Sequence, residues 1–358
     1  MLTWLLLLFI GGNAGAQGKY WYKSFVGTVD KYDFTLHLHK EGHDYSGYYY
    51  YNKAQQPISL SGNDTSTAGK ILLQAYVPGT ESDNETFTLE MRGDSLTGSW
   101  TKDHTDNKTY PVKAGPQTSV TPEFDLVYTS GSEKLRPKLE SSPQASYEAS
   151  AVWPKGNSPA LVNLKKIIRD QLFVKGTGDL GPLLLAQKKS FFADYLSGNK
   201  NVPDSEILEF TTGYTEDQSV RMAVMYHSTY ILTLSTVNYA YTGGAHGNYG
   251  THYVSVNPAT GKAYTLSDVL TGAGKKMLNS LLDKNFRKER NLTAKESLKE
   301  AGLFDDTITA NENFFLTGSG IGFNYVPYEI GPYAMGEVTV FIPYTDFGPA
   351  GLNPSFKR

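Results

Sequence analysis

Alternating apolar and polar residues in the first third of the chain constrain its fold more than any other feature. In the segment FTLHLH (34–39) every second residue from Phe34 is apolar, which is the period of a strand with one buried face. The segments YSGYYYYN, KILLQAYV and TFTLEM follow, separated by turn-forming Gly, Asn, Asp and Pro. No helical period occurs before residue 114, and the chain's 25 tyrosines favour β-structure. We therefore predict a small antiparallel β-barrel or sandwich over residues 17–115.

A change in composition separates this domain from the rest of the chain. The segment KAGPQTSVTPEF (113–124) has the Pro, Ser, Thr and Gly content of a linker, which we place at residues 116–122. Beyond it, apolar spacing predicts helices that begin at Pro159, at Pro182 and after Ser267. The sequence TAKE (293–296) has the pattern of a capping box, which predicts a fourth helix. Strands are expected at residues 220–226, 230–241, 251–256, 313–316, 321–325 and 337–343.

These elements together predict an α+β fold. The N-terminal barrel or sandwich is followed by an α+β domain with a mostly antiparallel sheet and flanking helices. We divide this second domain into residues 123–245 and 246–358.

Residues 1–16 have the composition of a signal peptide. An apolar run at 5–10 precedes small residues that suit cleavage after Ala16, and the run is too short to span a bilayer. We expect a periplasmic or secreted protein with no membrane span in the mature chain. The net charge of −3 argues against nucleic acid as a partner, and the absence of cysteine excludes disulfides and thiolate chemistry.

Familiar catalytic and cofactor motifs are weak or missing. GTGDLG (176–181) matches the letters of a dinucleotide fingerprint but lies between two predicted helices, so we interpret it as a loop. GSGIG (318–322) is interpreted as a hairpin turn. The sequence has no Walker loop, serine elbow or HExxH helix, and we expect no cofactor.

The segment HLHKEGH contains three histidines, His37, His39 and His43. The first two share one face of a predicted strand. We interpret them as part of a solvent-facing polar stripe, with a zinc site as the alternative.

Two loops rich in glycine, proline and tyrosine are the main functional candidates. YTGGAHGNYG (241–250) and YVPYEIGPYAMGE (325–337) each join two predicted strands. Rigid, tyrosine-rich loops lose little entropy on binding, although the same aromatics could also fold back over the core. The predicted contact residues are His246, Tyr328, Glu329, Pro332 and Tyr333, and the predicted loop-shaping residues are Gly243, Gly244 and Gly247. No metal site is assigned.

Both loops lie in stretches that resemble a known family. YTGGAHG…YVSVNPATGKAYTLSDVL and FFLTGSGIGFNYVPYEIGPYAMGEVTVFIPY resemble the C-terminal domain of RsiV-type lysozyme-sensing anti-sigma factors. That domain also occurs in PdaC-type peptidoglycan deacetylases and is known as domain of unknown function 3298. ASYEASAVWPKG…LVNLKKIIRDQLF resembles its companion, domain 4163. The resemblance covers residues 124–347 and leaves out the first β domain.

The resemblance implies an extracytoplasmic binding or accessory module in which the chemistry resides elsewhere. The sigma-binding segment, membrane helix and deacetylase domain of those families have no counterpart in this sequence. We therefore expect a non-enzymatic binding protein of the bacterial envelope, whose ligand is a lysozyme-like protein or a cell-wall glycan. The alternative is a metal-dependent envelope hydrolase that uses His246, His252 and Glu329.

Overall fold

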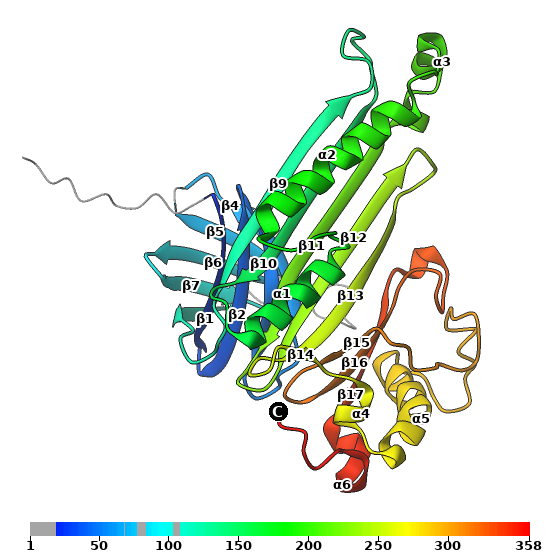
Figure 1. The fold of residues 1–358 in the computed structure, drawn as a ribbon. Helices are drawn as coiled ribbons and strands as arrows, with labels where there is room; N and C mark the ends of the chain where they lie inside the picture. Colours follow the sequence, from blue (N-terminus) through cyan, green and yellow to red (C-terminus); the bar gives the residue numbers. More distant parts are fainter. Residues whose placement is uncertain (1–18, 68, 77–83, 103–107) are drawn as a thin grey trace, which may run out of the picture.

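The computed structural model describes residues 19–67, 69–76, 84–102 and 108–358 (Figure 1). The predicted signal peptide lies outside these residues. Among the described helices, none has both the length and the apolar composition needed to cross a membrane.

The N-terminal part is a closed antiparallel barrel, as predicted. Alternate side chains fill its interior, among them Phe34, Leu36 and Leu38 from the segment with the clearest strand period. Each strand pairs with the next, and the last pairs with the first. The strands are β1 (Tyr20–Val29), β2 (Tyr32–Glu41), β3 (Asp44–Tyr51), β4 (Ile58–Asp64), β5 (Lys70–Tyr76), β6 (Asn84–Arg92), β7 (Ser95–Thr101) and β8 (Thr109–Pro116).

A long six-stranded sheet follows, in the order β14-β13-β12-β11-β10-β9. Its strands are β9 (Phe124–Lys134), β10 (Gln144–Pro154), β11 (Glu216–His227), β12 (Leu232–Thr242), β13 (Asn248–Asn257) and β14 (Lys262–Ala263). β10 and β11 run parallel, which requires the long helical connection between them, and all other neighbouring strands of this sheet are antiparallel. These connecting elements are α1 (Pro159–Gln171), α2 (Leu180–Gly198), α3 (Asp204–Glu209) and η1 (Thr211–Tyr214). Figure 1 shows α1 and α2 on one face of this sheet and the barrel behind it.

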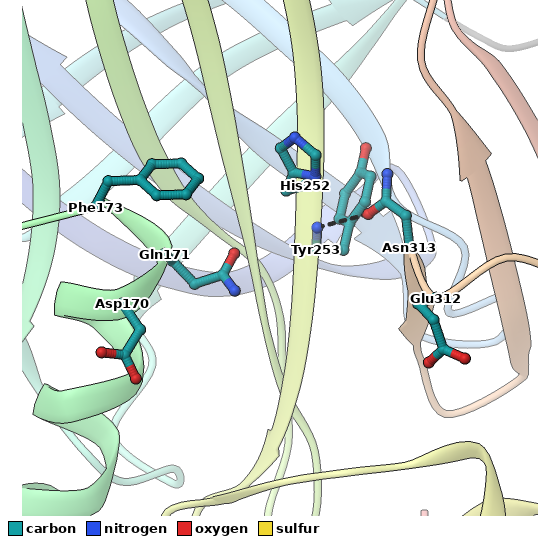
Figure 2. Close-up of a pocket in the computed structure, with 7 residues that line it drawn as sticks. All are labelled: Asp170, Gln171, Phe173, His252, Tyr253, Glu312 and Asn313. Carbon is teal, nitrogen blue, oxygen red and sulfur yellow. Dashed lines mark hydrogen bonds between the residues drawn. The ribbon is translucent and has the colours of Figure 1, made fainter. Parts of the chain in front are cut away.

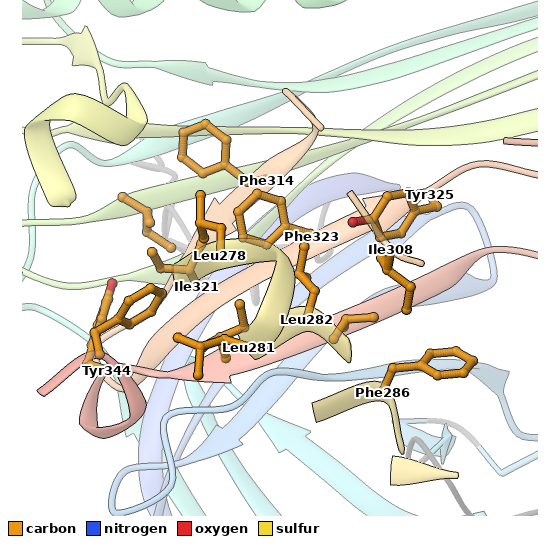
Figure 3. Packing of buried hydrophobic residues seen from close by; sticks show 14 of the residues in the cluster. Leu278, Leu281, Leu282, Phe286, Ile308, Phe314, Ile321, Phe323, Tyr325 and Tyr344 are labelled. Carbon is orange, nitrogen blue, oxygen red and sulfur yellow. The ribbon is translucent and has the colours of Figure 1, made fainter. Parts of the chain in front are cut away.

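The C-terminal part packs a helix on a three-stranded sheet, in the order β15-β16-β17. Leu278, Leu282 and Phe286 of the helix meet Ile321 and Phe323 of the sheet in one core (Figure 3). The elements are α4 (Leu266–Val269), α5 (Gly272–Glu289), β15 (Phe314–Leu316), β16 (Gly320–Tyr325), η2 (Tyr333–Met335), β17 (Val338–Pro343), η3 (Tyr344–Phe347) and α6 (Gly348–Gly351). The chain thus has the predicted α+β fold.

The predicted fourth helix is wrong. Glu296 Oε2 does accept from the Thr293 backbone N–H, as in a capping box, but only turns follow. The guanidinium of Arg287 donates to the carbonyl oxygens of Thr293 and Glu296, at 3.0 and 2.6 Å. The Thr293 carbonyl also accepts from the Glu296 backbone N–H at 3.4 Å, which closes a single turn. Arg287 thus occupies oxygens that the next turn of a helix would need.

The solvent-facing interpretation of His37 and His39 is also wrong. Their side chains lie on the outer face of the barrel, but the relative exposure is 0% for His37 and 1% for His39. Strand β11 of the long sheet packs over this face of β2 and β3. His43 stays exposed and lies 3.3 Å from Asp64. The alternation in sequence identified which residues share a face, but could not show that a second domain covers it.

Candidate functional site

The two predicted loops meet in the structure. The ring of His246, between β12 and β13, stacks on the ring of Tyr333, between β16 and β17, with centroids 4.0 Å apart and planes at 26°. The Tyr333 hydroxyl donates to the carbonyl oxygen of Gly247 at 2.8 Å. Tyr249 and Tyr328 flank Tyr333, with centroid distances of 5.9 and 5.6 Å. We call the side chains of His246, Tyr249, Tyr328 and Tyr333 the two-loop surface.

Two glycines in the first loop lie where an added Cβ would meet a close neighbour. Gly243 has a φ of +77°, and a Cβ there would lie 2.2 Å from the carbonyl oxygen of Gly213 in η1. A Cβ at Gly247 would lie 2.4 Å from the ring of Tyr239. Gly244 has no such constraint, because no atom lies within 4 Å of the Cβ position. Of the three predicted loop-shaping residues, only Gly243 meets backbone atoms that exclude a side chain, while a side chain at Gly247 would require the Tyr239 ring to move.

The second loop is held by its own acidic residue. Glu329 Oε1 accepts from Asn311 Nδ2 at 2.8 Å, and Oε2 accepts from the Val326 backbone N–H at 3.0 Å. Both carboxylate oxygens are thus occupied within the protein. Tyr328 has a φ of +71° and is 55% exposed, while Pro332 is exposed and directly precedes η2. Glu329 therefore shapes the loop, and Tyr328 presents its ring to solvent.

Side chains that the sequence did not single out attach this loop to β13. Glu337 Oε1 accepts from the Thr251 backbone N–H at 2.5 Å, and Asn324 Nδ2 donates to Glu337 Oε2 at 3.4 Å. Asn313 donates to the Thr251 carbonyl at 2.8 Å and accepts from the Tyr253 N–H at 3.0 Å. Polar side chains thus satisfy backbone groups along the edge of β13. The NEN sequence at 311–313, just before a predicted strand, was the available signal.

A hollow of about 290 Å³ lies beside this attachment (Figure 2). One wall is the end of α1, the floor is β13, and the other wall is the segment before β15. Asp170 and Glu312 contribute carboxylates from opposite walls, and the Asp170 carboxylate is paired with Lys166 Nζ at 2.5 Å. Phe173, 72% exposed with a φ of +54°, stands at its rim. The lining residues are Asp170, Gln171, Phe173, His252, Tyr253, Glu312 and Asn313.

The structure does not gather the residues of the alternative metal site. His246 stacks on Tyr333, Glu329 is bonded to Asn311, and His252 lies in the hollow of Figure 2. Within the ranges that the structure describes, no group of three or more His, Cys, Asp or Glu side chains is placed to hold a metal ion. The hydrolase alternative therefore lacks the ligand cluster that it requires.

Comparisons with known proteins place a recognised domain in the C-terminal part. Residues 267–345 match a family described as "Protein of unknown function (DUF3298)". The second loop lies within this domain and the first loop precedes it. No curated protein matches the chain.

Two solved structures of this family are similar to the chain. One is a member of the DUF3298 family from Bacteroides fragilis NCTC 9343, with a TM-score of 0.59 and 22% identity over 67% of this chain and 96% of that one. The other is a DUF3298 family protein from Pseudomonas aeruginosa PAO1, with a TM-score of 0.45 and 14% identity over 65% of this chain and 96% of that one. The first similarity shows a shared fold.

Proposed function

We propose that this chain is an exported, non-enzymatic binding protein of the bacterial cell envelope that holds its ligand at the two-loop surface. The main support for this proposal is that His246 stacks on Tyr333, although the two residues lie in loops more than 80 positions apart in the sequence. Their contacts order the aromatic side chains before any ligand arrives, which lowers the entropic cost of binding. The apolar run at residues 5–10 supports export.

A lysozyme-like protein is the ligand that we favour. His246, Tyr328 and Tyr333 of the two-loop surface lie outside the strands, and the exposed Tyr328 is suited to anchor a protein partner. The nearby hollow is lined by Asp170, which is paired with Lys166, and by the exposed carboxylate of Glu312, which suits a basic group of a partner. We further propose that residues 124–347 form an RsiV-type extracytoplasmic module, with a 4163-like part before the DUF3298 domain.

A cell-wall glycan is the second candidate ligand. A hollow of about 540 Å³ on the other face of the long sheet is lined by polar groups, including Ser130, Ser146 and Ser219. Tyr239 lines this hollow and also packs against Gly247 of the first loop. Hydroxyl and aromatic groups of this kind suit a carbohydrate.

Calorimetric titration with lysozyme and, separately, with muropeptides tests the proposal. We expect saturable binding of lysozyme by the wild type and a loss of about 2 kcal/mol of binding free energy in Tyr333→Ala, the size of a central interface anchor. Tyr32→Ala removes a tyrosine of the barrel that is 57% exposed and serves as the control, with unchanged affinity. Binding of muropeptides alone would select the glycan. If the wild type binds neither probe, or if Tyr333→Ala binds as tightly as the wild type, the proposal fails.

A further inference from the structure

Three buried histidines line the contact between the barrel and the long sheet. His37 and His39 come from β2 of the barrel, and His227 comes from the end of β11. All three are at most 3% exposed. We call them the histidine seam.

One hydrogen bond of the seam, that of His39, requires a neutral imidazole. His39 Nε2 lies 3.3 Å from the Val224 backbone N–H, so it accepts a hydrogen bond and carries no proton. His227 Nε2 lies 3.0 Å from the Thr121 carbonyl oxygen and therefore donates. His37 Nδ1 lies 2.8 Å from the Tyr22 hydroxyl, while its Nε2 is buried without a partner. Protonation would replace the acceptor on His39 with a donor that faces another donor.

Within the part of the chain that the structure describes, no carboxylate is bonded to an imidazole of the seam. Aromatic rings enclose it: Tyr22 lies 4.8 Å from His39 and Phe124 lies 6.0 Å from His227, between centroids. Charged groups between the barrel and the long sheet are paired with one another, where Arg221 lies 2.6 Å from Glu148 and 3.7 Å from Glu41. The titratable and charged side chains that face the seam or its edge are Tyr22 on β1, Glu41 on β2, Tyr48 and Tyr50 on β3, Tyr128 on β9, Glu148 on β10, and Arg221 and Tyr226 on β11.

Burial therefore opposes a positive charge on each histidine. It lowers the pKa of His39 to about 3 and that of His227 to about 4. The pKa of His37 is also lowered by burial, and further by the nearby His227 and His39. In an open seam the imidazoles would meet water and regain an ordinary pKa of about 6.5. As the pH falls below that value the open form binds more protons than the closed form, so acid favours opening.

We propose that the histidine seam makes the docking of the barrel on the long sheet sensitive to acid, so that the two separate below about pH 6 while each keeps its fold. The interior of the barrel forms a core of its own. Tyr22 and Tyr50 on its outer face pack against the cores of the other parts, so opening also separates these contacts. The connecting residues 117–123 keep the two parts tethered when the seam opens. The inference is independent of the ligand and of the two-loop surface.

Small-angle X-ray scattering between pH 7.5 and 4, together with far-UV circular dichroism, tests this proposal. The wild type is expected to show a larger radius of gyration below pH 6 with an unchanged far-UV spectrum. His39→Gln supplies an amide oxygen to the Val224 N–H, and His227→Gln supplies an amide N–H to the Thr121 carbonyl, without titrating. At pH 5.5, about one unit below the ordinary pKa of histidine, protonation of one exposed imidazole favours the open form roughly tenfold. Each variant removes one such imidazole and should therefore lower the ratio of open to closed molecules roughly tenfold.

His43→Gln is the matched control, because the side chain of His43 is 89% exposed and lies outside the seam. It should open at the same pH as the wild type. A radius of gyration that stays constant down to pH 4 would overturn the proposal. Loss of the far-UV signal together with the expansion, or glutamine variants that open like the wild type, would do so too.

Discussion

Phe286→Ala is expected to lower the free energy of unfolding of the C-terminal domain by about 3–5 kcal/mol, the usual cost of truncating a buried phenylalanine. The ring is 1% exposed and lies where α5 meets the three-stranded sheet (Figure 3). Its removal leaves a cavity that the helix, attached at both ends, can close only in part. Urea denaturation followed by circular dichroism measures the change.

Lys276→Ala on the exposed side of the same helix is the control and should change stability by less than about 0.5 kcal/mol. The second loop leaves β16 and returns to β17 of this core, so the Phe286 variant should also bind ligand more weakly near its unfolding midpoint. A destabilisation by Phe286→Ala of less than about 1 kcal/mol would contradict the packing described for this domain.

Gly243→Ala is expected to destabilise the protein by about 3 kcal/mol. The left-handed backbone conformation costs about 1–2 kcal/mol for an alanine, and the methyl group would also collide with the carbonyl oxygen of Gly213. The collision would push the first loop away from η1 and disturb the stacking of His246 on Tyr333. Thermal unfolding and hydrogen exchange of the loop amides measure both effects.

Gly244→Ala provides a matched comparison one residue away. No atom lies near its Cβ position, so we expect a change within about 0.5 kcal/mol. Equal destabilisation by the two alanine variants would show that the close approach of Gly243 to Gly213 does not hold the loop.

Much of the fold could be predicted because the relevant signals are local. The alternation from Phe34 to His39 predicted a strand and which of its residues share a face. Ser158 and Pro159 predicted where α1 begins. The burial of His37 depends on a strand that lies nearly 190 positions later, and no local pattern reports such a contact. The capping-box pattern at 293–296 failed for the same reason, because the competing donor is Arg287 on α5.

The candidate site could be predicted in outline. Glycine, proline and tyrosine content identified both loops, and the structure brings His246, Tyr328 and Tyr333 together. The role of Glu329 could not be foreseen, because its partner Asn311 lies in a different segment. Glu337 was missed because a single acid at the start of a strand carries no signal until β13 is placed beside it.

The affinity of Tyr328→Asn for lysozyme is the most direct test of the two-loop surface. Asparagine tolerates the left-handed backbone of this position better than other residues with a side chain, so the variant removes the exposed ring and keeps the loop. We predict a Kd at least roughly tenfold higher than that of the wild type, with Tyr32→Asn on the barrel unchanged. A Kd equal to that of the wild type would contradict the assignment of this surface as the binding site.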